Sequence, residues 1–375
     1  MEKVICMEIG QLLTRACEVE FHNDKINVVK AICFDTPINT VHDGFIKVTD
    51  ELAKEIKSQL KMNRMCAEKI YYAVTSTSFF FRPVETHDAD DNVLQKKLES
   101  MKVDIFPECD SRWRNTKPDE YAIKFFKTNV FVRNDQTTAR LEVFAIPKKL
   151  ITAYERLSLI LGIEFGGVVD SSYSIINACY NLFKYKTCIL VIVDEHVLRA
   201  HLVRDGKLIA ISEIDDCSLE FIIQDFVNSS LHVFPQTPAD AMYLLSDIEL
   251  LNRVARLETE KELIEKITTH ANDFCANIDS WLGFFCDRHG VKVNNVYFTG
   301  PLADIKGMPD YVSKKLNVPF IQLGDALINK INIPDSELSI VESIISCVYA
   351  FNNDVNFVTQ KHCVLNNISR FIIDK

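Results

Sequence analysis

The chain has 375 residues, of which 47% are hydrophobic and 25% are charged, so it is long enough to form two domains with separate buried cores. The 52 acidic residues exceed the 42 Lys and Arg residues and give a net charge of −10, which leaves no excess of positive charge to bind a nucleic-acid backbone. Twelve cysteines occur without a CxxC pair. Most of them lie within apolar runs, which is typical of buried thiols in a reducing compartment. No apolar run reaches the roughly 18 residues of a membrane span, and we expect a cytosolic protein.

The first eighty residues predict the element order β-β-β-α-β. Leu52, Ile56 and Leu60 recur at helical spacing, and the Thr49 hydroxyl can cap this helix. The strands are expected from short apolar runs rich in β-branched residues. The predicted elements are strands at 3–9, 14–21, 25–34 and 69–85 and a helix at 49–62.

Residues 84–166 have the character of an insertion with the order α-β-β-α. Two strand-like segments, 121–133 and 139–147, flank the polar turn NDQTT. The helix that follows is expected to begin near Pro147, because proline suits the first helical turn, and to end at Gly162.

The chain after residue 166 repeats the pattern of the first eighty residues. A buried strand leads to Asp194, and a second strand, the tight turn 204–207 and a third strand follow. A later strand ends in the turn Thr299-Gly300, and a helix and a short strand come after it. The remaining predicted helices span 218–230, 239–288 and 335–352.

A strand, an acidic residue, a tight turn and a second strand therefore occur twice, at 4–19 and at 188–204. This duplication is similar to the actin-like ATPase fold, in which two ribonuclease H-like halves hold a nucleotide between two phosphate-binding hairpins. The chain most resembles the PilM proteins of type IV pilus assembly and, more distantly, FtsA. Besides the first hairpin, the resemblance rests on Asp104-Ile105-Phe106-Pro107, AIPKKLITAYERLSLILGI at 145–163, VVDSSYSI at 168–175 and FTGPLADIKGMPDYVSKKLNVPF at 298–320.

The resemblance implies an α/β protein with the actin-like ATPase fold and an FtsA/PilM-type inserted subdomain. It implies that residues 1–83 form the first half, to which 335–375 return. Residues 84–166 would form the inserted subdomain, and 167–334 the second half.

In this fold the phosphates contact backbone N–H groups of each hairpin turn, and a carboxylate in each hairpin holds magnesium through water. In the first hairpin Glu8 replaces the family's Asp, Gly10 is retained, and Gln11 begins a bulky Gln-Leu-Leu sequence where small residues are usual. The resemblance therefore places Glu8, Gly10 and Gln11 at a nucleotide site, with Glu8 as a candidate magnesium ligand.

The second hairpin and a third loop complete this candidate site. Asp194 is retained as the other candidate magnesium ligand, but Glu195 stands where a small residue is usual. An added negative charge beside a triphosphate costs about 1–4 kcal/mol at intermediate dielectric. Gly300 and Pro301 replace a run of glycines, and Pro301 lacks a backbone donor. We therefore expect a degenerate site without hydrolysis; an ATPase that binds ATP and magnesium is the alternative.

Other residues and segments suggest further alternatives. An enzyme on this fold would need a catalytic carboxylate, and Asp170 is the candidate that the resemblance offers.

His196 and His201 are five residues apart, so on a strand they point to opposite faces and do not share a metal ion. The amphipathic segment 363–375 can pack on the protein itself or act as the membrane anchor of an FtsA-like filament protein.

The resemblance implies a cytoplasmic scaffold at the inner face of the membrane, in a type IV pilus or a related secretion machine. Its implied partner is the N-terminal cytoplasmic peptide of a PilN-like inner-membrane protein, held in a groove between the insertion and the first half. Self-association is a further option, and contact with the membrane would be peripheral. Phe106, Trp113, Phe125 and Phe131 are candidate apolar anchors, with core packing as the other interpretation.

Overall fold

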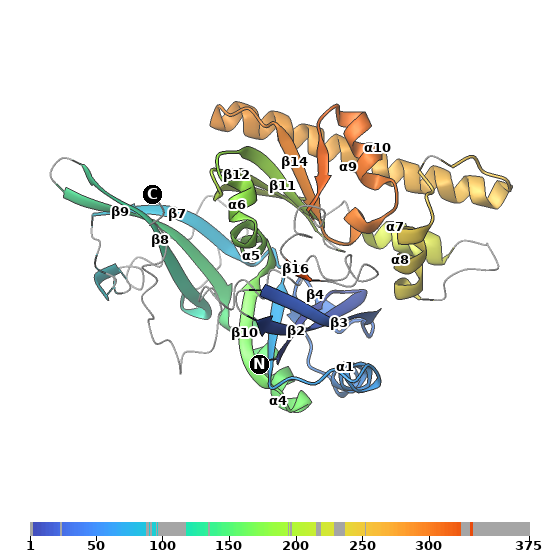
Figure 1. The fold of residues 1–375 in the computed structure, drawn as a ribbon, viewed down its shortest axis with the longest axis horizontal. Helices are drawn as coiled ribbons and strands as arrows, with labels where there is room; N and C mark the ends of the chain where they lie inside the picture. The colour runs from blue at the N-terminus through green and yellow to red at the C-terminus, as the bar shows by residue number, and fades with distance from the viewer. Residues whose placement is uncertain are drawn as a thin grey trace.

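The computed structural model contains three β-sheets of unequal size, and two of them are built on the same plan (Figure 1). The third sheet projects to one side of the other two. The structure describes residues 3–22, 25–87, 90, 92–94, 96, 118–133, 136–193, 195, 197–214, 219–228, 237–251, 253–323 and 331–332.

The first sheet has β1 (Lys3–Ile9) near its centre, because this strand is buried from Val4 onward. On one side β1 forms an antiparallel hairpin with β2, which continues to β3, and on the other side it runs parallel to β6, which is parallel to β10. The strand order is β10 (Glu164–Asp170), β6 (Lys69–Val74), β1, β2 (Leu13–His22), β3 (Lys25–Asp35) and β16 (Ile331–Asn332).

The second sheet repeats this plan around β11 (Thr187–Val193). This strand forms a hairpin with β12, which continues to β13, and it runs parallel to β14, which is parallel to β15. The predicted duplication is therefore confirmed in the strand pairing itself. The strand order is β13 (Lys207–Ile214), β12 (Leu198–Arg204), β11, β14 (Asn295–Thr299) and β15 (Phe320–Gln322).

The central strands are continuous apolar runs because both of their faces are covered. Ile189 and Val191 of β11 belong to the core shared with the long helix α9 (Glu258–His289). Cys188 and Leu190 belong to the core of the first half. Two short helices, α5 (Ser171–Ala178) and α6 (Tyr180–Phe183), lie between the two sheets in Figure 1.

The third sheet has the order β7 (Phe80–Thr86), β9 (Gln136–Pro147) and β8 (Tyr121–Arg133), all antiparallel. It has a small core of its own, which includes Leu141 and Val143, and Phe125 packs against this core. The part of the insertion that stands apart therefore begins with β7 and ends with β9.

The insertion was predicted to end at residue 166, but the packing shows that it ends earlier. Helix α4 (Lys148–Leu161) buries Leu150 and Tyr154 in the core of the first half, and β10 pairs with β6 in the first sheet. Both elements follow the insertion in sequence but belong to the first half, because their apolar faces have partners there.

The helix predicted at 49–62 and the helix predicted to end at Gly162 are confirmed, and one predicted helix is broken in two. The helix predicted to open the insertion lies largely outside the described residues. Helix α1 (Asp50–Met62) is capped by the Thr49 hydroxyl, and α4 ends at Gly162 in the left-handed conformation. The predicted helix 239–288 consists instead of α8 (Pro238–Asp247) and α9, with an irregular segment between them.

The other helices are α7 (Leu219–Val227) and α10 (Met308–Leu316), and short 3₁₀ turns occur at η1 (Pro118–Glu120) and η2 (Pro301–Asp304). A two-stranded ribbon joins β4 (Val41–His42) to β5 (Phe45–Ile46). Within the described ranges, no helix is both long and apolar enough to cross a membrane. The predicted helix 335–352, the return of 335–375, the tail 363–375 and the anchors Phe106 and Trp113 lie outside the described residues.

Helix α4 provides a matched test of this packing. Leu157 is fully buried and Leu159 is 79% exposed in the same helix. We expect Leu157→Ala to lower the free energy of unfolding by about 2–5 kcal/mol, because it leaves a cavity in the first core. Leu159→Ala should change it by less than about 0.5 kcal/mol. Urea unfolding of both variants measures this, and equal effects would contradict the placement of α4.

Candidate functional site

The two hairpin turns of the repeated sheets face each other, and one residue connects them. Glu195 lies in the turn between β11 and β12 and is only 1% exposed. Its carboxylate accepts hydrogen bonds from the backbone N–H groups of Leu12 (2.6 Å) and Leu13 (3.0 Å), which lie in the turn and at the start of β2. The turn predicted to hold a phosphate therefore holds a carboxylate of the opposite half.

Gly10 is required by this contact. A Cβ atom at Gly10 would lie 2.6 Å from Oε1 of Glu195, closer than side-chain atoms approach one another. The glycine retained in the first hairpin therefore leaves the space that the Glu195 carboxylate fills. Gln11 lines a small cavity beside this contact, and its buried Oε1 atom accepts no hydrogen bond from the described residues.

Glu8, the candidate magnesium ligand of the first hairpin, faces a cation of the same sheet. Nη2 of Arg15 lies 3.3 Å from Oε2 of Glu8, and both side chains are at most 8% exposed. The two residues are direct partners across the β1–β2 pair. Asp194 lies outside the described residues, and the described part of the chain contains no cluster of three or more His, Cys, Asp or Glu residues able to hold a metal ion.

The third predicted loop is shaped by close packing against β11. Gly300 has a φ of 97°, and a Cβ atom there would overlap the carbonyl oxygen of Val193. Pro301 is buried and begins η2, in which the N–H of Ala303 donates to the carbonyl of Gly300. The turn after β14 thus lies against the end of β11, next to the Glu195 turn.

The space left between these turns is small. Residues of both halves, among them Glu8, Gly10, Gln11 and Glu195, line a cavity of about 20 Å³. Since each water molecule needs roughly 10–15 Å³ measured in this way, the cavity has room for one or two waters.

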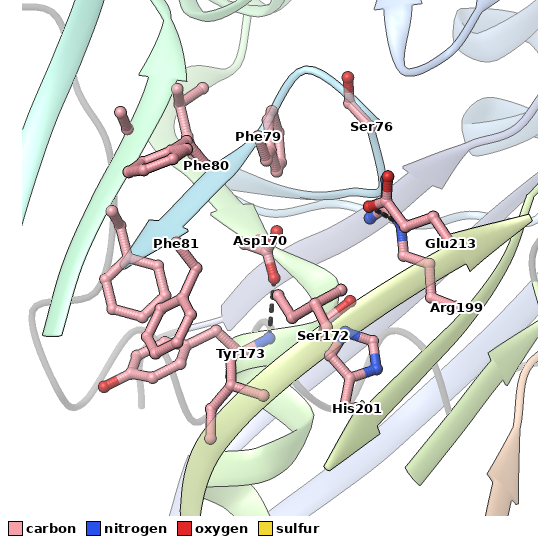
Figure 2. Close-up of a pocket in the computed structure, with 15 residues that line it drawn as sticks. Ser76, Phe79, Phe80, Phe81, Asp170, Ser172, Tyr173, Arg199, His201 and Glu213 are labelled. Carbon is pink, nitrogen blue, oxygen red and sulfur yellow. Dashed lines mark hydrogen bonds and ion pairs between the residues drawn. The ribbon is translucent and has the colours of Figure 1, made fainter. Parts of the chain in front are cut away.

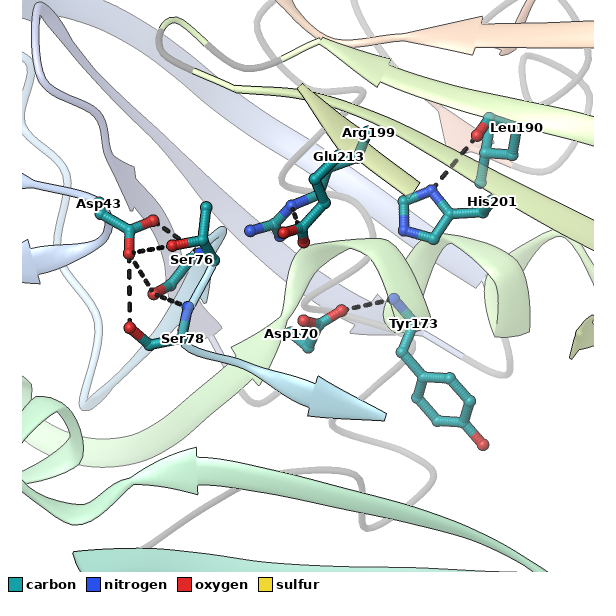
Figure 3. A network of polar contacts seen from close by, with 10 residues as sticks. Asp43, Ser76, Ser78, Asp170, Tyr173, Leu190, Arg199, His201 and Glu213 are labelled. Atoms are coloured by element: carbon teal, nitrogen blue, oxygen red, sulfur yellow. Dashed lines mark hydrogen bonds and ion pairs between the residues drawn. The ribbon is translucent and has the colours of Figure 1, made fainter. Parts of the chain in front are cut away.

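A polar cluster around Asp43, which was not predicted from the sequence, lies beside this cavity. Asp43 sits in the β4–β5 turn with a φ of 47°, and its carboxylate accepts from the N–H (2.6 Å) and hydroxyl (2.8 Å) of Thr77 and the hydroxyl of Ser76 (3.2 Å). Figure 3 shows Asp43 facing the loop that carries Ser76 and Ser78. The polar run TSTS directly after β6 was the signal that could have revealed this loop.

Asp170 lies at a different cavity, formed where the insertion meets both halves (Figure 2). Its carboxylate accepts a 2.8 Å hydrogen bond from the N–H of Tyr173, so it caps the first turn of α5. Burial raises the pKa of the Asp170 carboxyl, and the nearby Arg199 cation opposes that effect. The observed contact of Asp170 is structural, and its proposed catalytic role stays a prediction.

Two further polar side chains line this second cavity. Arg199 is 2% exposed, and its Nε lies 3.0 Å from Oε1 of Glu213. His201 is completely buried and its Nδ1 lies 3.3 Å from the carbonyl oxygen of Leu190, so the neutral ring carries its proton there (Figure 3). Burial, together with the charge of Arg199, lowers the pKa of His201 to about 3. His201 is therefore a buried, hydrogen-bonded residue, while His196 lies outside the described residues.

The comparisons with known proteins identify this arrangement of sheets. No protein-family model matches the sequence, and no curated protein matches it either. A chain of the solved "PilM-PilN type IV pilus biogenesis complex" superposes with a TM-score of 0.70 at 13% identity, covering 94% of this chain and 98% of that chain.

The chain has the actin-like ATPase fold. It resembles PilM within that fold. The ethanolamine utilization protein EutJ from Carboxydothermus hydrogenoformans is also similar, with a TM-score of 0.51 at 9% identity over 93% of this chain and 89% of that chain. The predicted fold class is thus confirmed, and at these identities the likeness concerns the fold alone.

The buried pair of the actin-like first half can be tested by removing its cation. We expect Arg15→Met to lower the free energy of unfolding by about 3–5 kcal/mol, because Glu8 then loses its charged partner in a buried position. Adding Glu8→Gln should recover a large part of this loss. Urea unfolding of the single and double variants gives the coupling, and additive effects of the two changes would contradict a direct pair.

His201 predicts a specific pH dependence of stability. Between pH 6.5 and about 3 the unfolded chain binds a proton on this imidazole that the folded chain does not, so its contribution to stability is lost as the pH falls. The slope reaches about 1.4 kcal/mol per pH unit. Burial raises the pKa values of Glu142 and Asp170, which acts in the opposite direction, so the test is the difference between wild type and His201→Gln. That difference should shrink from pH 7 to pH 4; a constant difference would contradict the buried neutral ring.

Proposed function

We propose that this protein is an actin-like scaffold of a type IV pilus or related secretion machine, which binds the cytoplasmic tail of an inner-membrane protein. The observation that carries this proposal is the agreement with the PilM chain across both halves and the insertion, over 94% of this chain and 98% of that chain. The proposed location is the cytoplasm at the inner face of the membrane, with peripheral contact only.

The proposed scaffold does not hydrolyse ATP. Three features of the cleft support this: the carboxylate of Glu8 faces Arg15, the first turn is filled by Glu195, and the remaining space accommodates only one or two water molecules. A catalytic site would need a carboxylate that holds magnesium and room for the triphosphate. Binding of ATP and magnesium would require the two halves to separate first.

The proposed partner is the N-terminal peptide of a PilN-like protein, bound where the insertion meets the first half. Phe79 and Phe81 are only partly buried here and pack on the first core, and both line the cavity drawn in Figure 2. The ring centroids of Phe81 and Phe144 are 5.0 Å apart, so strands β7 and β9 both contribute. Such partly exposed aromatic rings are the anchors that extended peptides use in recognition.

The partner proposal is tested with a synthetic peptide of the N-terminal cytoplasmic segment of the PilN-like protein encoded by the same organism. Fluorescence anisotropy should detect saturable binding to the wild-type protein and a loss of at least tenfold in affinity for Phe81→Asp, because a charge replaces an apolar anchor. Phe221→Asp is the matched control, since Phe221 is 49% exposed on α7 of the second half, and it should bind as wild type does.

Thermal unfolding of both variants checks that they are folded. Absence of peptide binding by the wild-type protein would contradict the scaffold role. Titration calorimetry with ATP and magnesium addresses the cleft separately: the proposal expects no phosphate release, and steady release that Glu8→Gln abolishes would contradict it.

A further inference from the structure

The turn of the first hairpin is an anion site with a ligand already bound. The N–H groups of Leu12 and Leu13 both donate to the carboxylate of Glu195, at 2.6 Å and 3.0 Å. Successive backbone N–H groups that converge on one anion form the concave site that phosphates and carboxylates occupy in proteins. Hydrogen bonds to an ionised acceptor are about twice as strong as neutral ones, so this contact is stronger than an ordinary turn contact.

The site is shaped for this particular ligand. Gly10 lies so close to the carboxylate that any side chain there would collide with it. Glu195 is 1% exposed, so water does not compete for its oxygens. The donors come from the first half and the ligand from the second, 182 or 183 residues away in sequence.

A second carboxylate crosses between the halves in the opposite direction. Asp35, at the end of β3 in the first half, accepts a 2.9 Å hydrogen bond from the N–H of Ala239 in the first turn of α8. The N–H groups of a first helical turn have no partner within the helix, and a negative charge is favoured there. Thr237 caps the same turn by accepting from the N–H of Asp240.

Each half therefore supplies one anion to backbone donors of the other half. An anion that is bound by one half and attached covalently to the other acts as a permanent bridge between them. A ligand that contacts both sides of a cleft stabilises the closed arrangement in the same way, but only while it is bound.

We propose that Glu195 is the built-in ligand of an oxyanion site formed by Leu12, Leu13 and Gly10, and that with Asp35 it holds the two halves closed without a nucleotide. When the Glu195 carboxylate is removed, the site takes a small carboxylate or inorganic phosphate from solution. This inference rests on the proposed function in one respect, because both assume that the cleft does not hydrolyse a nucleotide.

The test uses the full chain with Glu195→Ala, and acetate and inorganic phosphate as the probes. Hydrogen exchange of the Leu12 and Leu13 amides should become at least tenfold faster in Glu195→Ala, and millimolar acetate or phosphate should restore protection and raise the unfolding temperature relative to chloride at equal ionic strength. The wild-type protein should show no such anion dependence. Glu262→Ala is the matched control, because the Glu262 side chain is 71% exposed and lies on α9.

Glu195→Gln tests whether rescue requires an empty site. The Gln side chain has the same volume as Glu and keeps the site filled, so acetate should not rescue this variant. Should Glu195→Ala not fold in any buffer, Glu195→Asp, which draws the carboxylate back by one methylene, should show intermediate exchange at the same two amides. Unchanged protection of Leu12 and Leu13 in Glu195→Ala, or equal effects of acetate on wild type and Glu195→Ala, would overturn the proposal.

The outcome is separable from that of the proposed function. Hydrolysis of ATP by the wild-type protein would contradict the proposed scaffold role. The acetate experiment would still test the role of Glu195 independently. Loss of peptide binding would likewise leave the exchange of these two amides unaffected.

Discussion

The two halves of this protein meet through a carboxylate of one half that is bound by backbone amides of the other. Glu195 leaves the second sheet at the turn after β11 and ends on the N–H groups of Leu12 and Leu13. The repeated strand order makes this meeting possible, because β1 and β11 are equivalent central strands and their hairpin turns emerge at equivalent positions. The glycine at position 10 and the small remaining cavity both follow from the closeness of these turns.

The second cavity has a different character and lies at a different junction, where the insertion meets both halves. Its walls are mainly apolar, and its polar groups, Asp170, Arg199 and His201, are directed to local tasks: a helix cap, an ion pair with Glu213 and a hydrogen bond to Leu190. The cavity volume is about 30 Å³, which suits two or three water molecules. In the function proposed above, the aromatic side chains at its margin, rather than its interior, form the surface for an extended peptide.

Much of the fold could be predicted from the sequence because its signals are local or repeated. The first three strands, the Thr49 cap and the end of α4 at Gly162 depend on neighbouring residues, and the duplication at 188–204 depends on the same pattern occurring twice. The ribbon of β4 and β5 was not predicted, and the predicted strand 69–85 consists of β6 in the first sheet and β7 in the third. The boundary of the insertion was harder to predict, since the pairing of β10 with β6 joins residues almost one hundred positions apart. The break between α8 and α9 was also missed, because apolar residues continue at near-helical spacing through 248–251.

In the candidate site, too, local features could be predicted from the sequence and long-range contacts could not. Gly10 was placed at a phosphate-binding turn, and a carboxylate is indeed adjacent to it, but no local pattern indicates that this carboxylate belongs to Glu195. The charge of Glu195 was interpreted as a repulsion toward a phosphate, whereas its carboxylate lies on the donors that a phosphate would use. Local patterns do not reveal a contact between residues more than 180 positions apart. The cluster around Asp43 was missed for the same reason, because Thr77 lies in a different loop.

We propose that the cleft is closed by the protein's own carboxylate and not by a nucleotide. The decisive experiment is a crystal structure of the full chain grown with magnesium and a non-hydrolysable ATP analogue. We expect Glu195 within hydrogen-bonding distance of the Leu12 and Leu13 amides and no nucleotide between the hairpins. A phosphate of the analogue bound to those two amides, with the Glu195 side chain displaced, would contradict it.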